Sequence, residues 1–223
     1  MYMSSVRTLV VLLALVVVGC GSQGGPRNGT GNKVFEDVDF ERPIVYRFTK
    51  NFLDWAAKKG TKDLWLAAGA EAPLLFNDKP NTSLPPMEVV VGIEELDDPE
   101  PGAAQKYCDE QGWYAGTPYG KPTIYVCAKN YYDELPGSLQ DARRDPWYGQ
   151  WRRVAFLVHE AAHGLAGALH APAGVPAIMC GYPHEHPVLC YSTLTGLTDG
   201  DREMICPWTN GGGFCDRPVA QRP

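Results

Sequence analysis

The sequence predicts an α+β domain, and three segments support this assignment. MEVVVGI (87–93) is a β-branched run bounded by prolines and an acidic loop, and TIYVCA (123–128) follows another proline, so each segment predicts a strand. Asp145-Pro146 predicts the start of a long helix, because aspartate caps the first turn and proline is tolerated at the first helical position. Apolar residues then recur at helical spacing and predict a buried face: Trp151, Val154, Val158, Ala161, Ala162 and Leu165.

Two further segments complete the expected architecture. Within residues 39–59 we expect a helix from about Val45, with Gly60 as its stop. Its apolar residues recur at helical spacing: Val45, Phe48, Phe52, Trp55 and Ala56. The helix that starts at Asp145 is expected to break at Gly167. The chain beyond residue 180 is rich in proline and glycine, which predicts an irregular C-terminal part.

Length and charge limit the classes of protein. The chain has 223 residues and a formal net charge of −6. This length suits one domain with appendages, and we expect the domain to occupy residues 34–223. The basic residues form no stripe, so we expect no nucleic-acid partner. We expect a monomer.

Residues 1–20 predict a targeting segment. The apolar run 9–18 is too short for a membrane span of about 20 residues but suits a signal peptide. It ends in Val17-Val18-Gly19-Cys20, which resembles the lipobox of bacterial lipoproteins, whose cysteine is lipidated and becomes the new N-terminus. The alternative is an ordinary signal peptide with Cys20 as a bystander. The glycine-rich residues 21–33 predict a flexible tether. We therefore expect a bacterial cell-envelope protein, lipid-anchored or secreted, with membrane contact only through a lipid on Cys20.

The other cysteines predict disulfides. Six remain after Cys20: Cys108, Cys127, Cys180, Cys190, Cys206 and Cys215. An even number in an exported chain predicts three disulfides. Cys108–Cys127 is the favoured pair, because these residues flank a short excursion that ends in a strand. Cysteine-ligated zinc is the alternative, but the chain has no C-x-x-C pair.

HEAAHGLAGALH (159–170) holds three of the five histidines of the chain. His159 and His163 are four residues apart on the predicted helix, so both project from one face. Two such imidazoles can bind one zinc ion, and Glu160 is then placed to take a proton from a zinc-bound water. The alternative is a pair of ordinary histidines on an amphipathic helix. The pattern predicts a zinc site with Glu160 as the general base.

The residues after His163 resemble the metzincin clan of zinc peptidases. In that clan a glycine breaks the helix, a third histidine follows three residues later, and a methionine-containing turn lies beneath the metal. This chain has Gly167, then His170, then Pro176-Ala177-Ile178-Met179. The resemblance implies that His170 is the third zinc ligand. It also implies that Tyr182 helps to hold the metal or stabilises the oxyanion.

The same resemblance implies an architecture and a mode of substrate binding. Residues 197–204 resemble the closing helix of the clan, which is entered through a threonine or serine. The fold is then a metzincin-like zincin domain: a small mixed sheet with an edge strand, a backing helix, an active-site helix, and a disulfide-pinned C-terminal part. TIYVCA (123–128) would be the edge strand, along which a peptide substrate pairs through its main chain.

The spacing departs from the clan pattern H-E-x-x-H-x-x-G-x-x-H. One extra residue separates His163 from Gly167 and rotates the helix exit by about 100°. Tyr182 is also one position farther from Met179 than the Met-x-Tyr spacing of the clan. The chain is faintly similar to the aspzincins too, whose third ligand is an aspartate, but their G-T-x-D motif is absent. Other third ligands therefore stay open: His184, Glu185, His186, Asp199 and Asp201.

Together these patterns predict a zinc-dependent endopeptidase that acts on a protein or peptide substrate. The alternative is a non-catalytic cell-surface binding protein that keeps a zinc site on a metallopeptidase scaffold. Glu160 favours the enzyme, because a structural zinc site needs the histidines but not the base.

Overall fold

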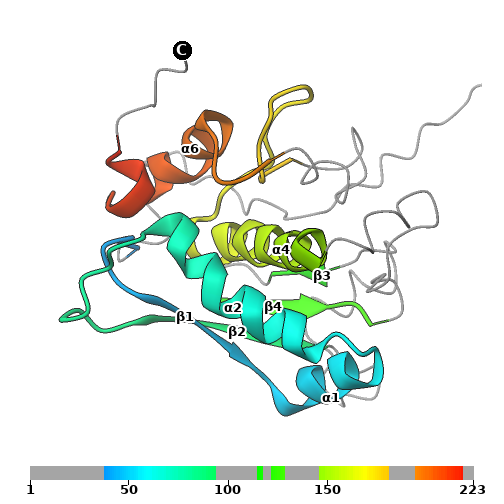
Figure 1. Cartoon of the computed structure of the whole chain (residues 1–223). Helices are drawn as coiled ribbons and strands as arrows, with labels where there is room; N and C mark the ends of the chain where they lie inside the picture. Colours follow the sequence, from blue (N-terminus) through cyan, green and yellow to red (C-terminus); the bar gives the residue numbers. More distant parts are fainter. Residues whose placement is uncertain (1–37, 94–114, 118–121, 129–145, 181–193, 218–223) are drawn as a thin grey trace, which may run out of the picture.

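The computed structural model describes residues 38–93, 115–117, 122–128, 146–180 and 194–217 (Figure 1). In these residues, helices α2 (Lys62–Phe76) and α4 (Pro146–Ala166) pack against each other over a four-stranded sheet. Residues 194–217 add α6 (Asp199–Ile205) and two short 3-10 helices. The predicted α+β class is confirmed.

The sheet is mixed and has the strand order β1-β2-β4-β3. β1 (Ile44–Phe48) pairs in parallel with β2 (Met87–Ile93), and β2 pairs in parallel with β4 (Thr123–Val126). β3 (Ala115–Gly116) is antiparallel to β4. Both predicted strands are confirmed, β2 at its predicted bounds and β4 over the first four residues of its predicted run.

The helix predicted from about Val45 is wrong in its first turn. Residues 44–48 form β1, in which Ile44 and Tyr46 are buried while Val45 is 47% exposed. Such alternation is the period-two pattern of a strand, and β-branched and aromatic residues favour that conformation. Helical spacing predicts Val45 on a buried face, but its side chain lies on the exposed side of β1.

α1 (Lys50–Lys58) is the part of the predicted helix that does form. Thr49 caps it, because its Oγ1 accepts a hydrogen bond from the backbone N–H of Phe52 at 3.3 Å. At the other end Gly60 has φ +70°, and the N–H groups of Gly60 and Thr61 donate to carbonyls of the last turn at 3.0 and 2.9 Å. A positive φ suits glycine, and the two bonds satisfy carbonyls that a helix end leaves unpaired. The predicted stop at Gly60 is confirmed.

The sequence patterns did not predict α2. This helix is apolar on most of its surface, and its outward Leu66 and Leu74 are 43% and 51% exposed. It therefore lacks the contrast between two faces by which an amphipathic helix is recognised. Its buried Trp65 packs edge-on against Phe52 of α1 and Phe156 of α4, with centroids 5.0 and 5.6 Å apart. No helix in the described ranges is both long enough and apolar enough to cross a membrane.

α4 begins at the predicted proline and carries the H-E-x-x-H pattern. Every residue from 151 to 166 is buried, because α2 and the sheet cover the helix on different sides. Tyr46 of β1 donates its buried hydroxyl to the carbonyl of Leu157 at 2.9 Å, which fixes α4 against the sheet. Side chains from 151 to 166 are therefore held by packing.

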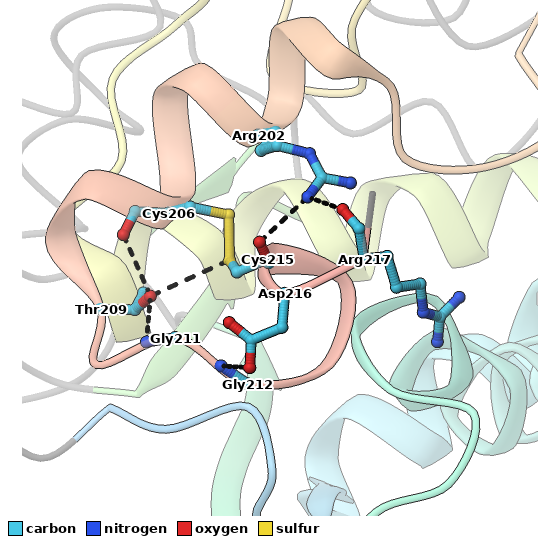
Figure 2. The surroundings of a disulfide bond; sticks show 8 residues. All are labelled: Arg202, Cys206, Thr209, Gly211, Gly212, Cys215, Asp216 and Arg217. Atoms are coloured by element: carbon cyan, nitrogen blue, oxygen red, sulfur yellow. Dashed lines mark hydrogen bonds between the residues drawn. A yellow bond between two sulfur atoms is a disulfide. The ribbon is translucent and has the colours of Figure 1, made fainter. Parts of the chain in front are cut away.

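The C-terminal part is held by a disulfide between Cys206 and Cys215 (Figure 2). It joins the 3-10 helices η2 (Cys206–Trp208) and η3 (Gly213–Cys215). Arg202 of α6 donates through Nη1 to the carbonyl of Cys215 at 3.0 Å. The predicted disulfide-pinned C-terminal part is confirmed for this segment.

Two further cysteines also form disulfides. Cys127 follows β4 and Cys180 follows the predicted methionine turn, and both are disulfide-bonded. Cys108, the predicted partner of Cys127, lies outside the described residues. The Cys108–Cys127 pair therefore stays a prediction.

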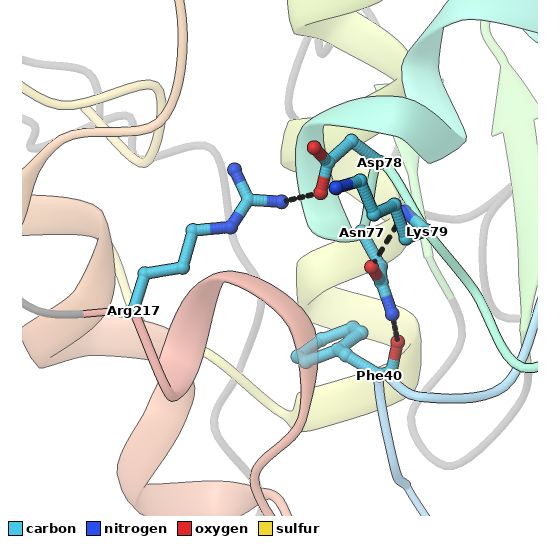
Figure 3. A network of polar contacts seen from close by, with 5 residues as sticks. All are labelled: Phe40, Asn77, Asp78, Lys79 and Arg217. Atoms are coloured by element: carbon cyan, nitrogen blue, oxygen red, sulfur yellow. Dashed lines mark hydrogen bonds and ion pairs between the residues drawn. The ribbon is translucent and has the colours of Figure 1, made fainter.

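Polar contacts tie the C-terminal part and the residues before β1 to the end of α2 (Figure 3). Arg217 forms an ion pair with Asp78, and Asn77 donates through Nδ2 to the carbonyl of Phe40 at 2.9 Å. The Phe40 ring stacks on Phe76 of α2, with centroids 4.8 Å apart. These segments, distant in sequence, thus share one core.

Candidate metal centre

Three imidazole rings converge where α4 ends. His159 and His163 lie on one face of the helix, and their Nε2 atoms are 3.0 Å apart. Both side chains are largely buried, at 4% and 9% exposure. Among the described residues, these two and His170 are the one group of histidine, cysteine and acidic side chains that could hold a metal ion.

The exit of α4 accommodates the extra residue that separates this chain from the clan pattern. The helix continues to Ala166, and Gly167 then turns the chain at φ +60°. The N–H of Ala168 donates to the carbonyl of Ala162, six residues back, at 3.2 Å. This final turn is wider than a regular α-helical turn, in which each N–H bonds four residues back.

His170 reaches the other two histidines from the loop after this turn. Its Nε2 lies 3.1 Å from that of His163 and 3.3 Å from that of His159. The structure therefore brings the three predicted ligands together, although one added residue in a regular helix would have rotated the exit by about 100°.

The distances between the three nitrogens fit one zinc ion. Two nitrogens that are each about 2.0–2.1 Å from a tetrahedral zinc lie roughly 3.3–3.4 Å apart. The observed triangle, with sides of 3.0, 3.1 and 3.3 Å, is slightly smaller than this. Three imidazoles that leave a fourth position open are a donor set of catalytic zinc sites rather than structural ones.

Backbone carbonyls orient two of the rings. Nδ1 of His159 lies 2.7 Å from the carbonyl oxygen of Ile178, and Nδ1 of His163 lies 2.7 Å from that of Ala168. A carbonyl only accepts, so each Nδ1 carries the proton and donates it. The lone pair of each ring is then on Nε2, and the two Nε2 atoms face each other at 3.0 Å. Such partners fix the tautomer and orientation of a metal-binding histidine.

The three imidazoles are neutral at pH 7. Burial, followed by the neighbouring rings, holds the pKa of His159 well below its ordinary value. Burial and then His170 lower the pKa of His163 to about 3, and burial lowers the pKa of His170. Because only a neutral imidazole binds a metal, the site is ready for a cation without losing protons first.

Glu160 lies beside this cluster, next to His159 on α4. It is 7% exposed, and its carboxylate oxygen Oε2 lies 3.1 Å from the hydroxyl of Thr117. Burial raises the pKa of Glu160 to about 7, while the hydrogen bond from Thr117 opposes this rise. A carboxyl with a pKa near neutrality can both take up and release a proton, as a general acid–base catalyst must. Sequence reasoning missed Thr117, which belongs to no motif.

The segment that resembles the methionine turn lies under the histidines. The carbonyl of Ile178 holds His159, and Met179 is fully buried. Asp201 of α6 fixes this segment, because its Oδ1 accepts the N–H of Met179 at 2.7 Å and its Oδ2 accepts the N–H of Thr198 at 2.8 Å. Asp201 is thus engaged with the backbone and is not part of the histidine cluster.

The other predicted site residues lie either outside the described residues or on α6. Tyr182 and the possible ligands His184, Glu185 and His186 lie outside the described residues. Asp199 begins α6 on an exposed surface and is not in the histidine cluster. With His170 beside His159 and His163, the cluster is complete without these alternatives.

The predicted edge strand is wrong. β4 pairs with β2 on one side and, through Tyr125 and Val126, with β3 on the other. In the described part of the sheet the edge on the side of β4 is therefore β3, and β1 is the opposite edge. A two-residue strand has too little alternating pattern to be predicted from sequence. Because Thr117 follows β3 directly and contacts Glu160, this edge runs beside the candidate site.

Comparisons with known proteins do not change this description. No family model matches the chain, and no curated protein or solved structure matches it either.

Proposed function

We propose that the protein is a zinc-dependent endopeptidase. The observation that carries the proposal is the convergence of three Nε2 atoms within 3.3 Å of one another, with Glu160 beside them on the same helix. Ordinary core histidines have no reason to direct three lone pairs at one point, whereas metal ligands do.

In the proposed reaction His159, His163 and His170 hold zinc and Glu160 moves the proton. When bound, zinc supplies a Lewis acid that activates water and polarises the carbonyl of the scissile peptide bond. Glu160 accepts a proton on its carboxylate and later delivers it to the leaving amine. We propose that the peptide pairs along β3, the edge next to Glu160.

We also propose that the domain is metzincin-like. Three features support this: Gly167 breaks α4 three residues before His170, the carbonyl of Ile178 holds His159, and Thr198 caps the closing helix α6. On this proposal Tyr182 helps to hold the metal or stabilises the oxyanion.

The proposed location is the bacterial cell envelope. The lipobox-like residues 17–20 support lipid attachment at Cys20, with residues 21–33 as a tether, and secretion without a lipid is the alternative. We propose a monomer whose contact with the membrane is made only by the lipid.

The proposal is tested by metal analysis and a proteolysis assay on the exported, purified protein. We expect about one zinc per chain, and hydrolysis of fluorescein-labelled casein that is lost with 1,10-phenanthroline and restored by zinc. Glu160→Gln is the matched variant: it should keep zinc but lower kcat by roughly 10²–10⁴-fold, the usual contribution of general acid–base catalysis. Wild-type turnover in this variant would exclude Glu160 as the base. A protein that binds zinc stoichiometrically but cleaves nothing would favour the non-catalytic binding protein.

A further inference from the structure

We propose that Thr117 positions Glu160: its hydroxyl fixes one oxygen of the carboxylate and leaves the other to exchange protons. This inference deepens the proposed peptidase function and rests on it. Thr117 Oγ1 lies 3.1 Å from Oε2 of Glu160, although the two residues are 43 positions apart in the chain. The contact is thus made by the tertiary fold and not by the H-E-x-x-H pattern.

The sheet fixes where the Thr117 hydroxyl lies. Thr117 directly follows β3, whose two residues pair with Val126 and Tyr125 of β4. Its backbone position is therefore set by the strand ladder, while that of Glu160 is set by the buried helix α4. A hydrogen bond between two such rigid elements can hold a side chain in one rotamer, as a catalytic group requires.

Within the described residues, one side-chain contact fixes the direction of this carboxylate. Glu160 is 7% exposed, and among the described residues Thr117 is the side chain that hydrogen-bonds to its carboxylate. A glutamate has three side-chain torsions, and packing against apolar neighbours does not select which way the carboxylate plane faces. The hydroxyl supplies the missing directional contact.

The hydroxyl has two acceptors within reach but only one proton. Besides Oε2 it lies 3.2 Å from the backbone carbonyl oxygen of Glu160. Hydrogen bonds to an ionised acceptor are roughly twice as strong as neutral ones. The proton therefore goes to Oε2 when Glu160 is ionised, and Oε1 is the oxygen left to take a proton from water. If the proton went to the carbonyl instead, Thr117 would only tie β3 to α4.

Three variants separate the two roles. Thr117→Val removes the hydroxyl and keeps the β-branched shape, and Thr117→Ser restores the hydroxyl. Thr61→Val is the matched control, because the hydroxyl of Thr61 donates to a backbone carbonyl, that of Ala56, at 3.3 Å and lies far from Glu160 in the chain. All variants are compared with wild type for zinc content, thermal unfolding and hydrolysis of a fluorescence-quenched peptide taken from a wild-type cleavage site in casein.

We expect Thr117→Val to keep its zinc and to lower kcat roughly 10- to 100-fold, the scale of loss from misplacing a catalytic group, while KM stays within about twofold. Thr117→Ser should recover most of kcat. Thr61→Val should lower the melting temperature about as much as Thr117→Val does, with kcat unchanged. Unchanged kcat in Thr117→Val, or equal losses in Thr117→Val and Thr117→Ser, would overturn the positioning role.

A readout without turnover separates this inference from the proposed function. The carboxyl carbon of Glu160 is followed by ¹³C NMR at one fixed pH in the zinc-loaded protein, with its signal assigned through Glu160→Gln. We expect the signal to shift in Thr117→Val, to return in Thr117→Ser and to be unmoved in Thr61→Val. If the wild type cleaves no peptide, the proposed function fails and this signal still decides the contact. A signal unmoved in Thr117→Val shows that the hydroxyl does not hold the carboxylate.

Discussion

His170 completes the nitrogen triangle although it follows the helix by one residue more than the clan pattern allows. We predict that His170→Ala weakens zinc binding by at least about 100-fold, because it removes one of three ligands, whereas loss of an outer-shell partner alone costs 10–100-fold. α4 should stay folded, since it ends at Ala166. Competition titration with a chromophoric zinc chelator measures the affinity, and circular dichroism checks the fold.

The matched variants for this prediction are His184→Ala and His186→Ala. Both residues lie outside the described part of the chain, and both remained possible ligands on sequence grounds. We expect these variants to bind zinc as the wild type does. Full zinc affinity in His170→Ala, with a loss in either of the others, would move the third ligand to residues 184–186.

Among the site residues, the sequence could predict those whose spacing along one helix places them together. His159, Glu160 and His163 lie on one helix, so spacing alone sets their relation. His170 depends on how the helix ends, and a wide last turn is not visible in a spacing count. Thr117 could not be predicted, because its contact with Glu160 depends on the pairing of β3 with β4.

Between elements, Asp201 joins α6 to the segment beneath the histidines. We predict that Asp201→Ala lowers the free energy of unfolding by about 2–4 kcal/mol, because it leaves two N–H groups without their acceptor: about 1–3 kcal/mol for the buried N–H of Met179, and less for the half-buried N–H of Thr198. Zinc affinity should also fall, since the carbonyl of Ile178 in this segment orients His159. Urea unfolding and zinc titration measure the two effects.

Asp199→Ala is the control for Asp201→Ala. Asp199 is in the first turn of the same helix but is exposed, so its removal should cost only about 0.3–1 kcal/mol through the helix dipole. Equal losses of unfolding free energy in the two variants would show that the hydrogen bonds of Asp201 stabilise the protein no more than an exposed carboxylate does.

Gly200 marks how closely α6 approaches the chain before the methionine turn. A Cβ at this position would lie 2.5 Å from Cγ1 of Val175 and 3.1 Å from the carbonyl oxygen of Pro176. Alanine is favoured over glycine in a helix by about 1 kcal/mol, so propensity alone predicts that Gly200→Ala stabilises the protein. We predict the opposite, a loss of about 1–3 kcal/mol from overpacking, measured by urea unfolding.

Gly196→Ala provides the comparison, because in the described part of the chain no atom beyond its two neighbours lies within 4 Å of where a Cβ would be. We expect this change to alter stability by less than about 0.5 kcal/mol. If Gly200→Ala is as stable as wild type, the contact between α6 and residues 175–176 is looser than the structure indicates.

At the scale of elements, the errors have two physical causes. Helical spacing wrongly predicts a helix over β1, because Val45 and Phe48 fit that spacing, whereas the burial of Ile44 and Tyr46 follows a period of two. α2 was not predicted because it is apolar on most sides, so it gives no periodic contrast. Elements with a strong local signal were predicted: β2 by its β-branched run, and α4 by its proline start.

At the scale of the whole molecule, the candidate metal ligands lie on one helix and on the loop that follows it. α4 provides two histidines, the loop after it provides the third, and the segment 176–179 orients the first through a backbone carbonyl. The sequence predicted the α+β class and the position of α4, because those depend on patterns within single segments. The sheet order could not be predicted, because it depends on contacts between β1, β2 and β4 over long separations.

Because one ion would join these segments, we predict that zinc removal destabilises the whole domain. At free zinc of about 100 times Kd, a ligand that binds only the folded state stabilises it by roughly 2.7 kcal/mol. For a domain of this size, each kcal/mol shifts the melting temperature by about 2–4 °C, so chelation should lower it by about 5–11 °C. Differential scanning calorimetry with zinc, with EDTA, and with EDTA followed by excess zinc measures the shift.

The variants His170→Ala and Glu160→Gln decide whether zinc bound at the proposed site causes this shift in melting temperature. Glu160→Gln keeps all three imidazoles, so its melting temperature should respond to zinc as much as that of the wild type. His170→Ala should lose most of the response at the same zinc concentration, because its Kd is higher and the stabilisation falls with the logarithm of that ratio. A zinc-dependent shift that is undiminished in His170→Ala would mean that the stabilising ion binds elsewhere in the chain.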